Sequence, residues 1–476
     1  MTDTPLHEQT ITELSARIRD RSLSPLALTE HLLARIEALN GPLHAFNLVT
    51  ADRALAEAEA ATKQLQAGQA VGPLHGIPYA VKDIFDVGGL PTTAGSVTLG
   101  ENIPAQDCTV TRKLREAGMI VLGKTITVEF AKGIAGINHI QGTPHNPWHA
   151  TPHIPGGSSA GSAVAVSSGM APMALGSDTG GSVRAPAALC GTVGLKTTVG
   201  RVSRHGVVPL SWSLDSVGPL TRSVEDAALV YQAMLGEDRN DDSTIGIPTH
   251  DVMPGLKTGV KGLRIGIPRD IFFDDLDPEV AAAMADCAQV FRDLGAHVEN
   301  IAYPEARTAQ AIRGSISGVE GCVIHEERIR TMVDAMDPIV GLRMLADRER
   351  SGPEYAAALR RMYALQREQL SGSLRDVDIL LTPTIPEPAR PVADFETSFE
   401  EYSRLSTRFS NNTATGNVLG LCGLSLPCGL SGNGLPMGLM LYAKPFAEDT
   451  LLRAGFAFEA ATDWSRQPDL GWITKA

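Results

Sequence analysis

Cysteine is scarce in this sequence, and none of its six cysteines lies in a C-x-x-C pair. The pattern indicates neither a zinc site nor a dense disulfide framework. Clusters of lysine and arginine are also absent, and the formal net charge is −13. Phosphate backbones are bound by clustered cationic side chains, so this charge argues against direct nucleic-acid binding.

Long apolar runs are missing as well, since no uninterrupted stretch reaches membrane-spanning length. The first residues lack the positive head and apolar stretch of a secretory signal. We therefore expect a cytoplasmic protein that has no membrane partner. The hydrophobic content of 43% and charged content of 20% are those of an ordinary globular chain.

The chain from residue 76 to about 220 alternates short apolar strands with helices, which predicts an α/β sheet covered by helical layers. Two helices are expected before it, over residues 26–39, ended by Asn40, and over residues 51–67. The predicted strands cover residues 80–85, 119–123 and 173–176, and the predicted helices cover residues 109–117, 160–168 and 224–235.

A mostly helical part begins near Gly262, with a strand at residues 263–268 and a helix opened by Asp277 and Pro278. Further buried strands are predicted at residues 377–383 and 437–441, so the chain returns to the sheet. We find no long linker and no internal repeat. These features favour one domain over residues 1–476, with N-terminal helices (1–70), a catalytic core (71–240), a variable helical region that shapes the substrate site (241–420) and a return to the core sheet (421–476).

Two glycine-flanked serine clusters occupy residues 156–162 and 177–184. The first matches G-x-S-x-G with Ser159 as the elbow nucleophile, but the residues before it form a proline-containing loop rather than the strand that an elbow needs. It also lacks the lysine of a phosphate-binding loop. Because an apolar helix follows, we interpret it as a loop that starts a helix.

The second cluster follows a strand and precedes a short helix that contains Pro186 in its first turn. Successive amides of Thr179, Gly180, Gly181 and Ser182 could form an anion-accepting nest, which is the construction of an oxyanion hole. Cys190 lies nearby, but its apolar surroundings raise a thiol pKa and favour core packing over nucleophilic chemistry.

A serine hydroxyl needs a base, and neither cluster contains a histidine. Lys82, which ends an apolar run, is the remaining candidate. A solvated lysine has a pKa of about 10.4, so burial would have to lower it by about 3 units. Alternation along a strand places Asp83 on the opposite side from Lys82 and leaves Asp86 unresolved. From the residues alone, a surface lysine beside aspartate is the favoured interpretation.

Motifs along nearly the whole chain, in this order, resemble those of the amidase signature hydrolases. They are Val81-Lys82-Asp83, Asn146-Pro147-Trp148, Gly156-Gly157-Ser158-Ser159-Ala160-Gly161-Ser162, Gly176-Ser177-Asp178-Thr179-Gly180-Gly181-Ser182-Val183-Arg184, Gly194-Leu195-Lys196-Thr197, Leu214-Asp215-Ser216-Val217-Gly218-Pro219, Ser223-Val224-Glu225-Asp226 and Leu380-Leu381-Thr382-Pro383-Thr384. Ala160 stands where glycine is common in the family. The resemblance implies the amidase signature fold, a large central mixed β-sheet with helices on both faces and an inserted, mostly helical region.

The resemblance also implies the roles of residues. Ser182 would be the acylated nucleophile, Ser158 the proton relay and Lys82 the base. The Gly157–Ser158 peptide would be cis, and Asp178 and Arg184 would pair to fix the oxyanion hole.

The implied activity is hydrolysis of a small carboxylic amide, or of a urea, carbamate or ester, without a metal or organic cofactor. Two alternatives stay open: the glutaminase-type A subunit of a tRNA-dependent amidotransferase, and a catalytically silent binding protein. Whether the chain forms a homodimer also stays open.

Overall fold

The computed structural model describes residues 4–69, 71–463 and 466–473. In this part of the chain eleven strands form one sheet in the order β1-β3-β2-β4-β6-β5-β10-β11-β9-β7-β8. The strands are β1 (Phe46–Val49), β2 (Pro78–Lys82), β3 (Ile120–Thr125), β4 (Met173–Asp178), β5 (Val193–Lys196), β6 (Ser216–Thr221), β7 (Arg264–Pro268), β8 (His297–Ile301), β9 (Ile379–Pro383), β10 (Cys422–Leu430) and β11 (Pro436–Ala443).

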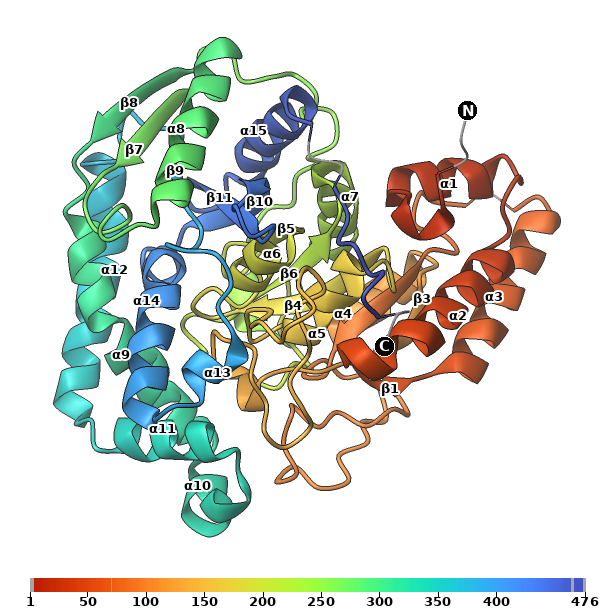
Figure 1. Cartoon of the computed structure of the whole chain (residues 1–476), viewed down its shortest axis with the longest axis horizontal. Helices are drawn as coiled ribbons and strands as arrows, with labels where there is room; N and C mark the ends of the chain where they lie inside the picture. Colours follow the sequence, from red (N-terminus) through yellow and green to blue (C-terminus); the bar gives the residue numbers. More distant parts are fainter. Residues whose placement is uncertain (1–3, 70, 464–465, 474–476) are drawn as a thin grey trace.

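Helices surround this sheet, and α9, α12 and α14 lie beside one another at the end opposite to α1, α2 and α3 (Figure 1). The α-helices are α1 (Ile11–Arg19), α2 (Pro25–Leu43), α3 (Ala51–Gln66), α4 (Thr109–Glu116), α5 (Ala160–Ser167), α6 (Arg184–Cys190), α7 (Val224–Met234), α8 (Pro278–Asp293), α9 (Glu305–Ile324), α10 (Glu326–Met332), α11 (Pro338–Arg348), α12 (Gly352–Ser371), α13 (Val392–Phe395), α14 (Phe399–Val418) and α15 (Glu448–Ala461). Short 3₁₀ helices span Leu6–Glu8, Glu129–Ala131, Asp242–Thr244 and Val333–Ala335.

The strand directions are mixed, as expected. β2 lies between β3 and β4 and is parallel to both. From β4 through β6, β5, β10 and β11 to β9, each strand is antiparallel to the next. The last part of the chain therefore inserts β10 and β11 between strands of two earlier segments.

Helices cover both faces of the sheet, and neighbouring residues of β10 demonstrate it. A Cβ built on Gly423 would lie 3.2 Å from the Arg184 side chain of α6. The next residue, Leu424, approaches Gly455 of α15 so closely that a Cβ there would lie 2.3 Å from it. Because successive strand residues face opposite sides, α6 and α15 lie on opposite faces.

Most predicted elements form within a few residues of their expected bounds, but β1, β5, β6, β8 and β10 were not predicted. The mostly helical region 241–420 supplies three strands to one end of the sheet: β7 and β9, which were expected, and β8, which was not. The predicted end of the helix at Asn40 is wrong, because α2 continues to Leu43. The Asn40 side chain instead bonds both the N–H and the carbonyl of Phe46, and so holds the chain beyond the helix.

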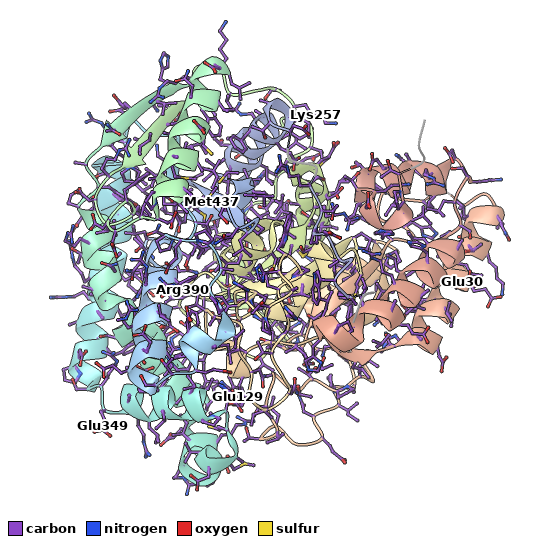
Figure 2. The ribbon with its side chains drawn as sticks, viewed as in Figure 1. Glu30, Glu129, Lys257, Glu349, Arg390 and Met437 are labelled. Atoms are coloured by element: carbon purple, nitrogen blue, oxygen red, sulfur yellow. The ribbon has the colours of Figure 1, made fainter. Side chains whose placement is uncertain are left out.

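Side chains fill the space between sheet and helices, with Met437 inside the molecule, Glu30 exposed on α2 and Glu349 exposed just after α11 (Figure 2). In the described ranges, none of the helices has both the length and the apolar character that a membrane crossing requires.

Candidate active site

Lys82 is the last residue of β2, and its side chain is fully buried. Its Nζ donates hydrogen bonds to Ser158 Oγ and Ser177 Oγ, both at 2.8 Å. Burial lowers the pKa of Lys82 to about 7, although the charges of Asp215 and Asp178 act in the opposite direction. The interpretation of Lys82 as a surface lysine is therefore wrong, and a large fraction of this amine is neutral near pH 7.

Asp83 points away from Lys82, as strand alternation predicts. Its carboxylate forms an ion pair with Lys124 at 2.6 Å and accepts hydrogen bonds from Asn47 and Thr93. Asp86 is not among the charges that act on Lys82. The nearest acidic neighbours in the sequence therefore do not hold Lys82 in its charged form.

Ser158 lies in the turn before α5, and the Gly157–Ser158 peptide bond is cis. The Gly157 N–H donates to the carbonyl of Ile134 at 2.7 Å. A Cβ at position 157 would lie 2.7 Å from the backbone nitrogen of Gly136, so only glycine fits between these two segments of chain. The Ser158 carbonyl accepts a hydrogen bond from Thr127 Oγ1 at 3.0 Å.

The turn between β4 and α6 is organised around a buried ion pair between Asp178 and Arg184, which confirms the expected pairing. Arg184 donates Nε to Asp178 Oδ2 at 2.9 Å and Nη2 to Oδ1 at 2.8 Å. Arg184 also donates to the Tyr442 hydroxyl and to Asn417 Oδ1, both at 2.7 Å, and Asn417 Nδ2 donates to Asp178 Oδ1 at 2.9 Å. Burial alone would raise the pKa of Asp178, but the Arg184 charge and these hydrogen bonds hold it below its ordinary value.

One of the four amides expected to form an oxyanion hole is occupied. The Gly181 N–H donates to Asp178 Oδ1 at 2.8 Å, so it is not free to bind an oxyanion. Gly181 has φ +125°, and a Cβ there would lie 2.2 Å from Thr413 Oγ1. The amides of Thr179, Gly180 and Ser182 have no hydrogen-bond acceptor within the described residues.

Ser182 opens onto a cavity of about 400 Å³, which Thr179 and Gly180 also line. Its side chain lies in the same turn, and the residue is 5% exposed. Among the residues that the structure describes, no hydrogen bond involves the Ser182 hydroxyl, and none joins it to Ser158. The fold thus bonds Lys82 to Ser158, and Ser182, whose hydroxyl has no hydrogen-bond partner in the described structure, lines the cavity.

Sequence reasoning did not assign a role to Ser177 or Asp215. Ser177 is the second hydroxyl partner of Lys82. Asp215 accepts a hydrogen bond from Thr179 Oγ1 at 2.5 Å and from the N–H groups of Leu210 and Ser211 at 2.9 Å. Both residues belong to motifs that the sequence displays, so their positions were visible although their contacts were not.

Two rejected nucleophiles remain unsuitable in the structure. Ser159 is fully buried just before α5, where its hydroxyl donates a long hydrogen bond of 3.5 Å to the Ser177 carbonyl. Cys190 is buried, and burial raises the pKa of its thiol well above the ordinary value. Within the described ranges, no group of three or more His, Cys, Asp or Glu side chains is arranged to hold a metal ion.

Comparison with known proteins agrees with this arrangement. The sequence model of the amidase family matches residues 27–452. The A subunit of glutamyl-tRNA(Gln) amidotransferase from Trichlorobacter lovleyi is 39% identical over 482 residues, which cover 96% of this chain and 98% of that protein. The chain belongs to the amidase family and is an enzyme that acts on carbon–nitrogen bonds other than peptide bonds.

Two solved structures show the same fold. One, described as a vestigial protein complex that reveals the origins of an s-triazine catabolic enzyme, has a TM-score of 0.89 and 32% identity, covering 95% of this chain and 98% of the other. A second, described as an amidase, has a TM-score of 0.84 and 34% identity, covering 95% and 99%. The amidase signature fold expected from the motifs is therefore confirmed.

Proposed function

We propose that this enzyme hydrolyses a small carboxylic amide through a seryl acyl-enzyme at Ser182, and that it works without a partner protein. The single observation that carries the hydrolytic mechanism is the buried Lys82 amine, with a pKa near 7, hydrogen-bonded to the hydroxyl of Ser158. A neutral amine can accept a proton from a hydroxyl, whereas an ordinary charged lysine cannot.

In the proposed first step, Ser182 Oγ attacks the amide carbonyl. Its proton passes to Ser158 Oγ, and the Ser158 proton passes to neutral Lys82. The amides of Thr179, Gly180 and Ser182 would donate to the developing oxyanion, since they line the cavity and have no other acceptor in the described structure.

The tetrahedral intermediate then collapses. The carbon–nitrogen bond breaks, and the leaving nitrogen takes a proton from Ser158, which Lys82 reprotonates. A water molecule attacks the acyl-enzyme along the same route, its proton going to Ser158 and Lys82. The ester bond to Ser182 breaks, the acid leaves, and the Ser182 hydroxyl is restored.

Variants of the three residues test this scheme with a simple aryl amide as substrate. We expect Lys82→Ala, Ser158→Ala and Ser182→Ala each to lower kcat by at least about a thousandfold. Ser159→Ala is the matched control, because it removes the neighbouring hydroxyl of the same turn and should retain most of the activity. Full activity in Ser182→Ala would refute the mechanism.

Covalent labelling separates this proposal from a silent binding protein. A fluorophosphonate should form one phosphonyl–serine bond with loss of fluoride, and peptide mass spectrometry should place it on Ser182. Wild type that gives neither labelling nor turnover would favour the binding protein instead.

A second candidate function is glutamine hydrolysis as the A subunit of a tRNA-dependent amidotransferase. Its support comes from relatives that carry the name of the glutamyl-tRNA(Gln) amidotransferase A subunit and align over nearly the whole chain. Purified chain that turns over simple amides at about 1 s⁻¹ or faster would support the self-sufficient amidase. Turnover restricted to glutamine, and weak without other subunits, would support the second candidate.

A further inference from the structure

The cavity in front of Ser182 is strongly cationic. Its charged lining residues are four basic ones, Lys132, Arg313, Arg343 and Arg350, and one acidic one, Asp347. The basic residues come from the segment after β3 and from helices α9 and α11 with the turn that follows. An uncharged amide would give no reason for this imbalance.

Two of the four cations are already paired. Lys132 Nζ lies 2.7 Å from Asp347 Oδ2, and Arg350 Nε lies 3.1 Å from Asp347 Oδ1. Arg350 also reaches Glu354 at 3.3 Å. The single acidic group of the lining is therefore fully engaged by residues of the protein itself.

Arg313 and Arg343 form no ion pair within the described structure. Arg343 donates to the carbonyl of Lys132 at 3.0 Å and lies beside the neutral Tyr402 hydroxyl. Arg313 donates from Nη2 to the carbonyl of Thr407 at 3.5 Å, while its Nη1 is buried without any hydrogen-bond partner. Burial, followed by the charge of Arg343, lowers the pKa of Arg313 to about 10, and no carboxylate offsets either effect.

Arg313 as a whole is half-buried, but its Nη1 is buried, and a buried guanidinium N–H without an acceptor is unfavourable unless a ligand supplies one. The charges of Arg313 and Arg343 repel each other, and both residues line the cavity that also contains the Ser182 turn. A planar guanidinium matches a carboxylate through two parallel N–H···O bonds. The geometry therefore favours an anionic group on the same molecule that presents its amide to Ser182.

We propose that the substrate of this site is an amide that carries a carboxylate, bound by Arg313 and Arg343, and no ammonium group beside that carboxylate. The proposal rests on the amidase function proposed above and specifies its substrate class. An ammonium group is excluded because Asp347, the one carboxylate among the residues that line the cavity, is already paired with Lys132 and Arg350. A ligand ammonium would therefore lie in a positive cavity without a carboxylate partner.

Three matched substrates test the proposal. Pentanamide has no charge, glutaramate is a primary amide of similar length that ends in a carboxylate, and glutamine is glutaramate with an added α-ammonium. We expect kcat/KM for glutaramate to exceed that for pentanamide by about tenfold to a hundredfold, the range for hydrogen bonds to charged groups. Glutamine should be the poorer substrate of the two carboxylates. Equal rates on pentanamide and glutaramate, or a preference for glutamine, would overturn the proposal.

Variants connect the preference to the arginines. Arg313→Gln should reduce the ratio of kcat/KM for glutaramate over pentanamide to near one, mainly by raising KM for glutaramate, and Arg343→Gln should act in the same direction. Arg360→Gln, at an exposed position on α12, is the matched control and should leave the ratio unchanged. An unchanged ratio in both cavity variants would overturn the assignment.

Binding without turnover separates this proposal from the mechanism. Calorimetry with glutarate, the expected product, should show binding to Ser182→Ala and a loss of at least about tenfold in affinity when Arg313→Gln is added. If Ser182→Ala were fully active, the mechanism would fail while this titration would still decide the carboxylate site. Equal glutarate affinity with and without Arg313 would reject the site whatever the mechanism.

Discussion

Three lysines in the described structure are fully buried, and their partners differ in a way that decides their chemistry. Lys124 forms an ion pair with Asp83 at 2.6 Å and has one hydroxyl partner, Thr92 Oγ1, at 3.1 Å. Lys196 donates to the carbonyls of Thr197 and Leu421, which have no proton to give. Lys82 alone has two hydroxyl partners, Ser158 and Ser177. It is therefore the one buried lysine of the three that can exchange a proton with a serine.

The pH dependence of the reaction tests the state of Lys82. Its pKa is lowered to about 7, so the amine is protonated and unable to act as base below that pH. We expect kcat/KM for a neutral amide to rise about tenfold per pH unit below pH 7 and to level off above about pH 8. Stopped assays from pH 5 to 9 measure this profile. A flat profile over that range would contradict lysine as the base.

The same pKa shift affects stability with a definite sign. Between about pH 7 and the unfolded value of 10.5, the unfolded chain binds a proton at Lys82 that the folded chain does not. The contribution of Lys82 to the free energy of unfolding therefore increases as the pH rises through this window. It is unfavourable below pH 7, where the buried amine must carry a charge.

Gly181 offers a second test at the scale of a single residue. Its φ of +125° and its contact with Thr413 leave no room for a side chain, whereas a Cβ on Gly180 would meet only the Ala414 side chain at 3.5 Å. Gly181→Ala should lower the free energy of unfolding by about 1–3 kcal/mol. Gly180→Ala should change it by less than about 1 kcal/mol. Urea denaturation of the two variants compares them, and equal losses would contradict this account.

The turn between β4 and α6 shows how one element depends on distant ones. Arg184 and Asp178 lie in or beside that turn, but Asn417 comes from the end of α14 and Tyr442 from β11. The Tyr442 hydroxyl accepts from Arg184 at 2.7 Å and donates to the carbonyl of Asn412 at 2.6 Å. The C-terminal part of the chain therefore fixes the geometry of the loop that carries Ser182.

Removing the Tyr442 hydroxyl tests this dependence. Tyr442→Phe should lower the free energy of unfolding by about 1–3 kcal/mol, because an arginine N–H and a carbonyl lose their buried partner. Tyr79→Phe is the matched control, since the Tyr79 hydroxyl is buried without a hydrogen-bond partner. Its effect should be near zero. If both variants lost the same stability, the hydroxyl contacts of Tyr442 would not stabilise the turn.

The two serine turns could be predicted from the sequence because their signals are local. Glycines and serines at fixed spacing, followed by an apolar helix, identify loops such as the one before α5. The strands β1, β6 and β10 could not be identified in this way. β1 is a four-residue strand with one fully buried position, and β6 contains both glycine and proline, which are depleted in strands. Pairing with β3, β4 and β5 stabilises them, and that pairing is not local.

At the scale of the whole molecule, the walls of the cavity come from segments far apart in the chain. Ser182 lies in the turn that follows β4, whereas Arg313 lies on α9 and Arg343 on α11. The sequence alone assigns no role to either arginine. Only the folded chain brings them to the Ser182 turn, so the motifs predict the chemistry and not the substrate.

The N-terminal helix α1 is held to the rest of the molecule by Asp226 of α7, whose carboxylate accepts from the N–H groups of Ile11 and Thr12 at 2.9 and 3.1 Å. These amides begin a helix and have no partner within it. Asp226→Ala should therefore increase hydrogen exchange throughout α1 and lower the free energy of unfolding by about 2–4 kcal/mol. Glu225→Ala is the matched control, because Glu225 pairs only with the exposed Lys257, and should change stability by less than about 1 kcal/mol. Exchange in α1 that is the same in both variants would mean that apolar packing of Ile11 and Leu14, rather than Asp226, holds the helix in place.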